Sequence, residues 1–259
     1  MIKGIFDSHS HYDDQAFDND REKLIDSLLI DVNSPVERIM HACTDEKSAQ
    51  FGLKMAEKYK HFYTSAGFHP ECMDRLPKNY MEILKELVEN NPQIKAIGEI
   101  GLDYHYDGYD REAQIELLSN QLEYALQKDL PVILHCRDAL TDFMELIKKY
   151  NPKGVVHCFS GSAETAKEIL KLDMYIGFTG VLTFKNAKKA KKAFEVVPMN
   201  RLLLETDCPY MAPEPFRGKR CSSEMIEKIA ICAAEIKGVD TQTIINKTNE
   251  NARRLFKIN

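Results

Sequence analysis

Two histidines, His9 and His11, stand one residue apart shortly after the apolar run at residues 2–6. Successive side chains of an extended chain point to opposite faces, so both imidazoles would project to the same side. Neutral imidazole nitrogens bind zinc, manganese or iron, and two of them supply half of a coordination shell. Such a pair alone is equally consistent with a chance polar strand end, so its interpretation depends on the rest of the chain.

Further residues of metal-binding type end other apolar runs: Glu99, His135, His157 and Asp207. A titratable side chain in an apolar strand costs several kcal/mol unless it is paired or binds a metal. Any one of them alone could be a hydrogen-bonded core residue, but this explanation is poor for a whole set at equivalent strand ends. The pattern therefore predicts a metal site formed by the two histidines of the first run and these residues.

The predicted ligand set suits hydrolysis. It is larger than one tetrahedral ion needs, and a carboxylate such as Glu99 can bridge two ions about 4 Å apart. Ions bound in this way lower the pKa of water, which then becomes a nucleophile near neutral pH. Asp207 could bind one ion and also take the proton, which makes Glu99 and Asp207 the catalytic candidates. Glu205 would orient a ligating histidine or, alternatively, form an ion pair lower in the fold.

Substrate contacts are expected from other polar residues near the same strand ends. Arg137 follows His135 by two and shares its face, where a guanidinium can bind a phosphate through two hydrogen bonds. His69 suits a phosphate or leaving-group contact, and Arg217 is either a phosphate contact or a solvated surface residue. Asp103 is expected to orient a metal-binding histidine or to cap a turn. We assign no role to the remaining histidines, His41, His61 and His105.

Two cysteines, Cys136 and Cys158, directly follow predicted histidine ligands and should face the opposite side of their strands. We expect them to be small buried side chains that point toward the helices; the alternative is a cysteine–histidine nucleophile pair. The chain has 7 cysteines and no Cys-x-x-Cys spacing, which predicts reduced thiols rather than a disulfide framework.

Short apolar runs alternate with amphipathic stretches along the whole chain. The amphipathic stretches, such as Ile115, Leu118 and Leu122, have the spacing of helices that pack one face on a sheet. Strands covered by helices in this order predict a parallel sheet, and its closed form is a (β/α)8 TIM barrel with its site at the carboxyl ends of the strands. A doubly wound open sheet is the alternative, but no Gly-x-Gly-x-x-Gly motif supports it. The expected strands cover residues 2–6, 36–43, 62–68, 94–100, 132–136, 154–159, 174–180 and 201–206.

Bulk composition narrows the class of protein. A length of 259 residues with 44% hydrophobic residues is consistent with a single domain over residues 1–259. No apolar run is long enough to span a membrane and no signal segment begins the chain, so we expect a cytoplasmic protein without an obligate protein partner. The net charge of −5 argues against a broad surface that coats nucleic acid. Basic residues do cluster at 185–192, where a solvated helix face is expected, and at 217–220.

The sequence resembles the TatD family of metal-dependent deoxyribonucleases, within the amidohydrolase-type barrels, over nearly its whole length. The resemblance rests on FDSHSH at residues 6–11, GFHP at 67–70, GEIGLDY at 98–104, LHCR at 134–137, HCFSG at 157–161, ETDCPY at 205–210 and RGKR at 217–220. After RGKR, where relatives commonly continue with Asn, this chain has CSS at 221–223.

This resemblance implies a barrel that holds one or two divalent ions (Mg, Mn or Zn) through the predicted ligand set. Glu99 stands in the place of the carbamylated lysine that bridges the metals of many amidohydrolases. The implied activity is hydrolysis of DNA phosphodiester bonds, exonucleolytic on single strands, with DNA strand ends as the substrate.

Two other functions use the same residues differently. A related hydrolase could act on a small ester, amide or phosphoester, or on an aminoacyl ester of RNA, because the metal cluster supplies only nucleophile and electrophile. His69, Arg137 and the loop at 217–220 favour phosphate, as does an expected scarcity of aromatic residues around the site. A barrel that only binds a partner is disfavoured because the ligand set is complete.

Overall fold

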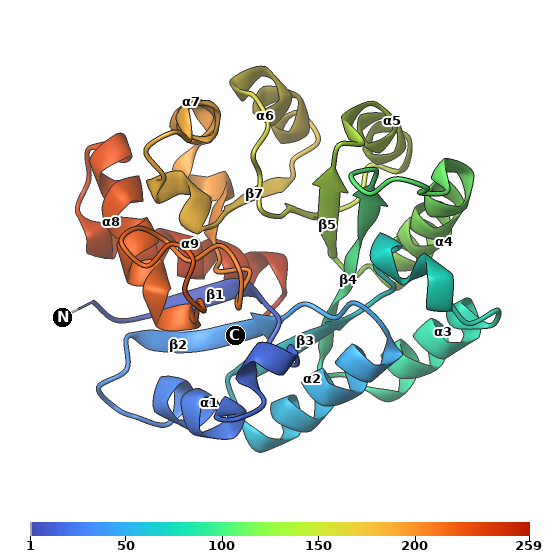
Figure 1. Cartoon of the computed structure of the whole chain (residues 1–259), viewed down its shortest axis with the longest axis horizontal. Helices are drawn as coiled ribbons and strands as arrows, with labels where there is room; N and C mark the ends of the chain where they lie inside the picture. Colours follow the sequence, from blue (N-terminus) through green and yellow to red (C-terminus); the bar gives the residue numbers. More distant parts are fainter. Residues whose placement is uncertain (1) are drawn as a thin grey trace.

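The computed structural model describes residues 2–259. Its strands form one parallel sheet in which neighbouring strands follow chain order from β1 to β8. The helices surround this sheet (Figure 1). The sheet of 8 strands curls until its first and last strands meet, which confirms the predicted (β/α)8 barrel and excludes the doubly wound alternative. The strands are β1 (Ile5–Ser10), β2 (Val36–His41), β3 (Phe62–Ala66), β4 (Ile94–Asp103), β5 (Val132–Arg137), β6 (Gly154–Val156), β7 (Tyr175–Phe178) and β8 (Leu202–Leu204).

Helices connect the strands, and several begin where the sequence has a side chain that caps a helix. The Asp45 carboxylate accepts from Ser48 N before α2, and Asp110 and Asp240 cap α4 and α9 in the same way. Among residues 2–259, no helix combines the length and the apolar character needed to cross a membrane. The helices are α1 (Arg21–Leu29), α2 (Glu46–Lys58), α3 (Tyr80–Asn90), α4 (Arg111–Lys128), α5 (Leu140–Tyr150), α6 (Ala163–Leu170), α7 (Lys188–Val196), α8 (Ile226–Lys237) and α9 (Thr241–Leu255).

Several strands are shorter than predicted, including β6, which ends at Val156 just before His157, whereas β1 and β4 extend further toward the site. β1 begins at Ile5 and continues to Ser10, so His9 lies within the strand. It continues because its polar side chains are buried and hydrogen-bonded: Ser8 Oγ donates to Leu204 O at 3.1 Å and Ser10 Oγ to Met40 O at 2.9 Å. β4 likewise runs to Asp103, and its pairing with β5 shifts register between residues 97 and 100, where Glu99 lies.

Side chains from the strands fill the barrel interior, and α9 covers one of its ends. Phe6, Met40 and Ile133 belong to one buried cluster together with Leu255 and Phe256 at the end of α9. The rings of Phe6 and Phe256 lie 6.2 Å apart. Since Phe6 precedes His9 along β1, α9 covers the amino-terminal end of the barrel. The carboxyl-terminal end, where the predicted ligands lie, is not covered by α9.

Candidate metal centre

All the predicted ligands converge at the carboxyl-terminal end of the barrel, and Glu99 lies at their centre. Its Oε2 lies 3.2 Å from His9 Nε2 and 3.4 Å from His11 Nε2. Its Oε1 lies 3.1 Å from His135 Nδ1 and 2.7 Å from His157 Nε2. Each oxygen of one carboxylate therefore faces its own pair of histidines, as expected of a carboxylate that bridges two ions.

Asp207 completes the side of the cluster formed by β1. Its Oδ1 lies 3.3 Å from His11 Nε2 and 3.6 Å from His9 Nε2. The two imidazole Nε2 atoms are 3.0 Å apart, as expected if His9 and His11 project to one side. Two backbone hydrogen bonds bring Asp207 and this pair together: Asp207 N donates to His9 O at 2.9 Å, and His11 N donates to Cys208 O at 2.8 Å.

The donor set fits divalent metal ions. Three groups of ligand atoms, each within 4.8 Å of one another, could hold an ion. His9, His69, Glu99 and His157 are buried, and the side chains of His11, His135 and Asp207 are at most 18% exposed. Removing this many ring nitrogens and carboxylates from solvent costs free energy unless they form a compensating interaction, and metal coordination would supply one. The groups are His9, His11 and Glu99; His9, His157 and Asp207; and His69, Glu99 and His135.

Asp103 lies beside His135 and determines which of its ring nitrogens faces the cluster. Asp103 Oδ2 lies 3.1 Å from His135 Nε2, and Glu99 Oε1 lies 3.1 Å from its Nδ1. With a metal ion bound at Nδ1, the proton of the neutral ring would stay on Nε2 and point to Asp103. Asp103 Oδ1 also accepts from His105 N at 2.9 Å. The two functions predicted as alternatives for Asp103, orienting a histidine and capping a turn, are thus both performed by the one carboxylate.

His69, predicted as a substrate contact, joins the cluster with its Nε2 at 3.5 Å from Glu99 Oε1. Its Nδ1 accepts a hydrogen bond from Glu71 N at 3.2 Å. In the neutral ring the proton must then be on Nε2, which makes this atom a donor to oxygen, and His69 could serve in its ligand group with Glu99 and His135 only as the other tautomer. The tautomer with the proton on Nε2 suits the predicted contact with a substrate oxygen.

Glu205 is fully buried next to His157. Its Oε1 accepts from Cys158 N at 2.5 Å and lies 3.7 Å from His157 Nδ1, which has no hydrogen-bond partner. Burial raises the pKa of Glu205 to about 7. No lysine or arginine of residues 2–259 forms an ion pair with Glu205. Of the two alternatives predicted for Glu205, the structure therefore shows the position beside a histidine and not the ion pair lower in the barrel.

The two predicted arginines lie outside the metal cluster, against aromatic rings. The Arg137 guanidinium lies 5.2 Å from the centre of the Tyr106 ring, with Nη1 3.9 Å from Asp103 Oδ2. Arg217 lies 4.4 Å from the centre of the Phe184 ring. Tyr106 and Tyr210 are among the most exposed large side chains. The expectation that aromatic residues are scarce around the site was therefore wrong, because it considered the strand ends and not the loops that follow them.

Both cysteines that follow histidine ligands are partly exposed, so the prediction that they are buried was wrong. Cys158 lies beyond the end of β6 with a left-handed φ of 45°, so strand alternation does not apply to it; its Sγ lies 3.6 Å from Thr179 Oγ1. Desolvation raises the pKa of the Cys136 thiol to about 12 and that of Cys158 well above its usual value. Protonated thiols are poor nucleophiles, which argues against a cysteine–histidine pair.

A buried network centred on Asp7, which was not predicted from the sequence, lies beneath the metal cluster. The Asp7 carboxylate accepts hydrogen bonds from Thr206 N at 3.0 Å, Thr206 Oγ1 at 2.6 Å and Ser223 Oγ at 2.7 Å. Tyr12 OH lies 2.7 Å from the same Ser223 hydroxyl. Burial raises the pKa of Asp7 to about 6. A signal existed, since Asp7 and Thr206 are polar residues within two positions of predicted ligands in two of the motifs.

Comparisons with known proteins agree with this geometry. A family model described as "TatD related DNase" matches residues 6–257. YabD of Bacillus subtilis, an uncharacterized metal-dependent hydrolase, is 38% identical over 258 residues, which cover 98% of this chain and 100% of YabD.

Solved structures agree as well. The crystal structure of YjjV, a TatD homologue from Escherichia coli K12, has a TM-score of 0.93 at 30% identity, covering 100% of both chains. A TatD family hydrolase from Entamoeba histolytica has a TM-score of 0.86 at 26% identity, covering 98% of both chains. The barrel and its cluster of histidines and carboxylates define a metal-dependent hydrolase. The chain belongs to the TatD family.

Proposed function

We propose that this protein is a metal-dependent deoxyribonuclease that releases nucleotides from the ends of single-stranded DNA. The observation that carries the proposal is the Glu99 carboxylate, whose two oxygens each face a pair of histidine nitrogens. This arrangement is that of two-metal sites, which stabilise both the attacking and the leaving oxygen of a phosphoryl transfer. The description of the matching family as related to a DNase supports phosphodiesters as the substrate.

Two ions would be held by different parts of the cluster, with Glu99 shared between them. His9, His11 and Asp207 would hold one, and His135 and His157 the other. Bound there, divalent ions would supply positive charge to the phosphoryl oxygens and lower the pKa of water. The many imidazole ligands favour manganese or zinc over magnesium, which prefers oxygen ligands.

The chain's own residues would then bind the phosphate and move a proton. Asp207, with 13% of its side chain exposed, would accept the proton of the attacking water at a carboxylate oxygen. As water oxygen bonds to phosphorus, the bond from phosphorus to the leaving sugar oxygen breaks. His69 Nε2–H would donate a hydrogen bond to a phosphoryl or leaving oxygen. Arg137, with 41% of its side chain exposed, would contact the phosphate from the side.

The test is a nuclease assay on metal-stripped protein. End-labelled single-stranded DNA is incubated with the protein, and magnesium, manganese or zinc is added back separately. We expect release of nucleotides that requires metal, is strongest with manganese or zinc, and is lost in Glu99→Gln. Intact DNA with every metal, from protein that still binds two ions tightly, would contradict the proposal.

A second candidate is hydrolysis of a small ester or of an aminoacyl ester of RNA. A cleft of about 830 Å³ beside Asp103 is lined by acidic residues, including Glu71 and Asp107. Carboxylates next to the metal centre suit an ammonium group better than they suit a chain of phosphates. If DNA stays intact, release of an amino acid from aminoacylated RNA, assayed in parallel with the same metals, would support this candidate.

A further inference from the structure

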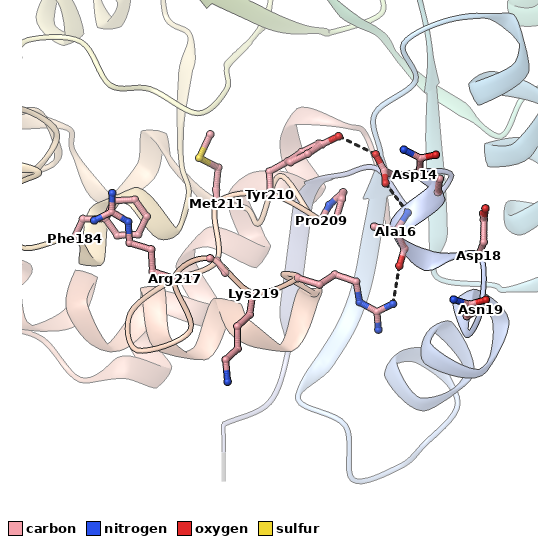
Figure 2. Close-up of a pocket in the computed structure, with 14 residues that line it drawn as sticks. Asp14, Ala16, Asp18, Asn19, Phe184, Pro209, Tyr210, Met211, Arg217 and Lys219 are labelled. Atoms are coloured by element: carbon pink, nitrogen blue, oxygen red, sulfur yellow. Dashed lines mark hydrogen bonds between the residues drawn. The ribbon is translucent and has the colours of Figure 1, made fainter.

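Two clefts lie at different places around the metal centre. The first, of about 900 Å³, lies between the loops that follow β1 and β8, and Tyr210, Arg217 and Lys219 line it (Figure 2). The second, of about 830 Å³, lies between the loops that follow β3 and β4, and Asp103 lines it. Because the strands follow chain order around the barrel, the metal centre separates the two clefts.

The first cleft has a surplus of positive charge. Of its two acidic residues, Asp18 pairs with Arg21 at 2.6 Å, whereas Asp14 accepts from Tyr210 OH at 2.8 Å and keeps its negative charge. Arg220 is likewise neutralised, by Asp20 at 2.7 Å. Within residues 2–259, neither Arg217 nor Lys219 forms a salt bridge. Two cations thus remain for a ligand.

Apolar surface accompanies these cations. Tyr210 is 55% exposed and Met211 is 39% exposed, although both side chains are large. Figure 2 shows Tyr210 reaching across toward Asp14, while Arg217 lies flat on Phe184. Exposed aromatic rings next to unpaired cations are typical of grooves that bind single-stranded nucleic acid, because bases stack on the rings while phosphates meet the cations.

The second cleft has the opposite charge. Glu71 and Asp107 have no salt-bridge partner among residues 2–259, and Asp110 caps α4 through Ala113 N. Arg137 lies over the Tyr106 ring beside this cleft, with its Nη1 3.9 Å from Asp103 Oδ2. A phosphodiester chain led through this cleft would bring its charges next to uncompensated carboxylates, which repel them.

We propose that a single-stranded nucleic acid binds on one side of the metal centre only, along the first cleft, and that the acidic second cleft prevents the chain from continuing. The scissile phosphate must then lie near the end of a strand. This inference rests on the proposed function and adds to it the path of the substrate and the reason why a chain end is required.

The test compares linear and covalently closed circular single-stranded DNA of the same sequence. With manganese, the wild-type protein should degrade the linear form and leave the circle intact. The double variant Glu71→Gln/Asp107→Asn, which removes the two carboxylates that neither pair with a cation nor cap a helix, should begin to cut the circle. A wild-type protein that cuts the circle as fast as the linear form would overturn the inference.

Variants of the first cleft give a second measurement. Arg217→Ala and Lys219→Ala should each raise the KM for a ten-nucleotide oligomer by about fivefold to tenfold and reduce its salt dependence, with a much smaller change in kcat. Lys85→Ala, which removes an exposed lysine from α3, is the matched control and should behave as wild type. Unchanged KM values for both cleft variants would contradict the proposed path.

A binding measurement distinguishes an error in the proposed substrate path from an error in the proposed function. If no DNA is hydrolysed, the nuclease proposal falls, and anisotropy of a fluorescent oligomer in EDTA decides the inference. Weaker binding by Arg217→Ala/Lys219→Ala than by wild type would support the cleft, whereas equal binding, or none by wild type, would overturn it. The same titration with an RNA oligomer distinguishes DNA from RNA as the source of the strand.

Discussion

Asp7 Oδ2 accepts a hydrogen bond from Thr206 Oγ1 at 2.6 Å, and this contact joins the first strand of the barrel to the residues that follow the last. The seam between β1 and β8 also has the isolated bridge between Ser10 and Cys208, together with the backbone hydrogen bonds from Asp207 N to His9 O and from His11 N to Cys208 O. Because His9 and Asp207 lie on opposite sides of this seam, Asp7 holds together two parts of the metal centre. Its bond to Ser223 ties the loop after Arg220 to the same point.

We predict that Asp7→Asn destabilises the protein. The amide replaces one acceptor oxygen by a donor that faces the Thr206 or Ser223 hydrogen atoms, and a buried group left without a partner costs roughly 1–3 kcal/mol. The free energy of unfolding in urea measures the change. Ser223→Ala, which removes one of the donors, should have a smaller effect. Equal stability of Asp7→Asn and wild type would show that the network is dispensable.

Substitution of the two carboxylates should have different effects on metal binding. Glu99→Gln should weaken both ions because both histidine pairs face this carboxylate, whereas Asp207→Asn should weaken only the ion beside His9 and His11. Equilibrium dialysis with manganese counts the ions bound. Glu86→Gln, an exposed residue of α3, is the isosteric control. Loss of the same number of ions in both variants would argue against a shared Glu99.

Gly177 leaves room for the Glu205 side chain. A Cβ at this position would lie 2.3 Å from Glu205 Oε2, so Gly177→Ala must displace the carboxylate that lies beside His157. Displacement of a group that supports a metal ligand typically lowers metal affinity by about 10-fold to 100-fold.

A second glycine supplies the control. Gly52→Ala would place a Cβ 2.0 Å from Thr64 Oγ1, away from the metal cluster. It should lower stability and leave manganese affinity close to that of wild type. If both variants lose affinity equally, general disruption explains the loss and Glu205 has no particular part in it.

His41 should make stability depend on pH. It is fully buried beside Ser48 Oγ at 3.3 Å, and burial lowers its pKa from the ordinary value of 6.5 to about 4. In the unfolded chain His41 therefore becomes protonated below about pH 6.5, whereas in the folded chain it becomes protonated only near pH 4. As the pH falls through this window, the free energy of unfolding decreases.

The contribution of His41 is roughly 3 kcal/mol at most, from 1.36 kcal/mol per pKa unit. Urea unfolding at pH 7, 6, 5 and 4 measures it. His41→Gln keeps a polar group near Ser48 but does not titrate, so the loss of stability between pH 6.5 and 4 should be smaller in this variant than in wild type. Equal losses in the two proteins would contradict this explanation.

Part of the site follows from local sequence. The spacing of His9 and His11 places both rings on one face because alternation along an extended chain is a property of the backbone alone. His135, His157 and Asp207 could be assigned for a related reason: each follows an apolar run, and the carboxyl ends of parallel strands meet at one end of a barrel. These patterns together with the family motifs were enough to predict the barrel and all the residues that face Glu99.

Other features were decided by the tertiary structure. Strand bounds such as the extension of β4 past Glu99 depend on pairing with β5, and the proton on His135 Nε2 depends on Asp103. Asp7 meets Thr206 only because the sheet closes on itself, so residues 199 positions apart come into hydrogen-bonding distance. The opposite charges of the two clefts likewise depend on which carboxylates lie within ion-pairing distance of a cation in the folded chain. Alternation and helical periodicity act between neighbours in sequence, whereas ion pairing and closure of the sheet act between residues that only folding brings together.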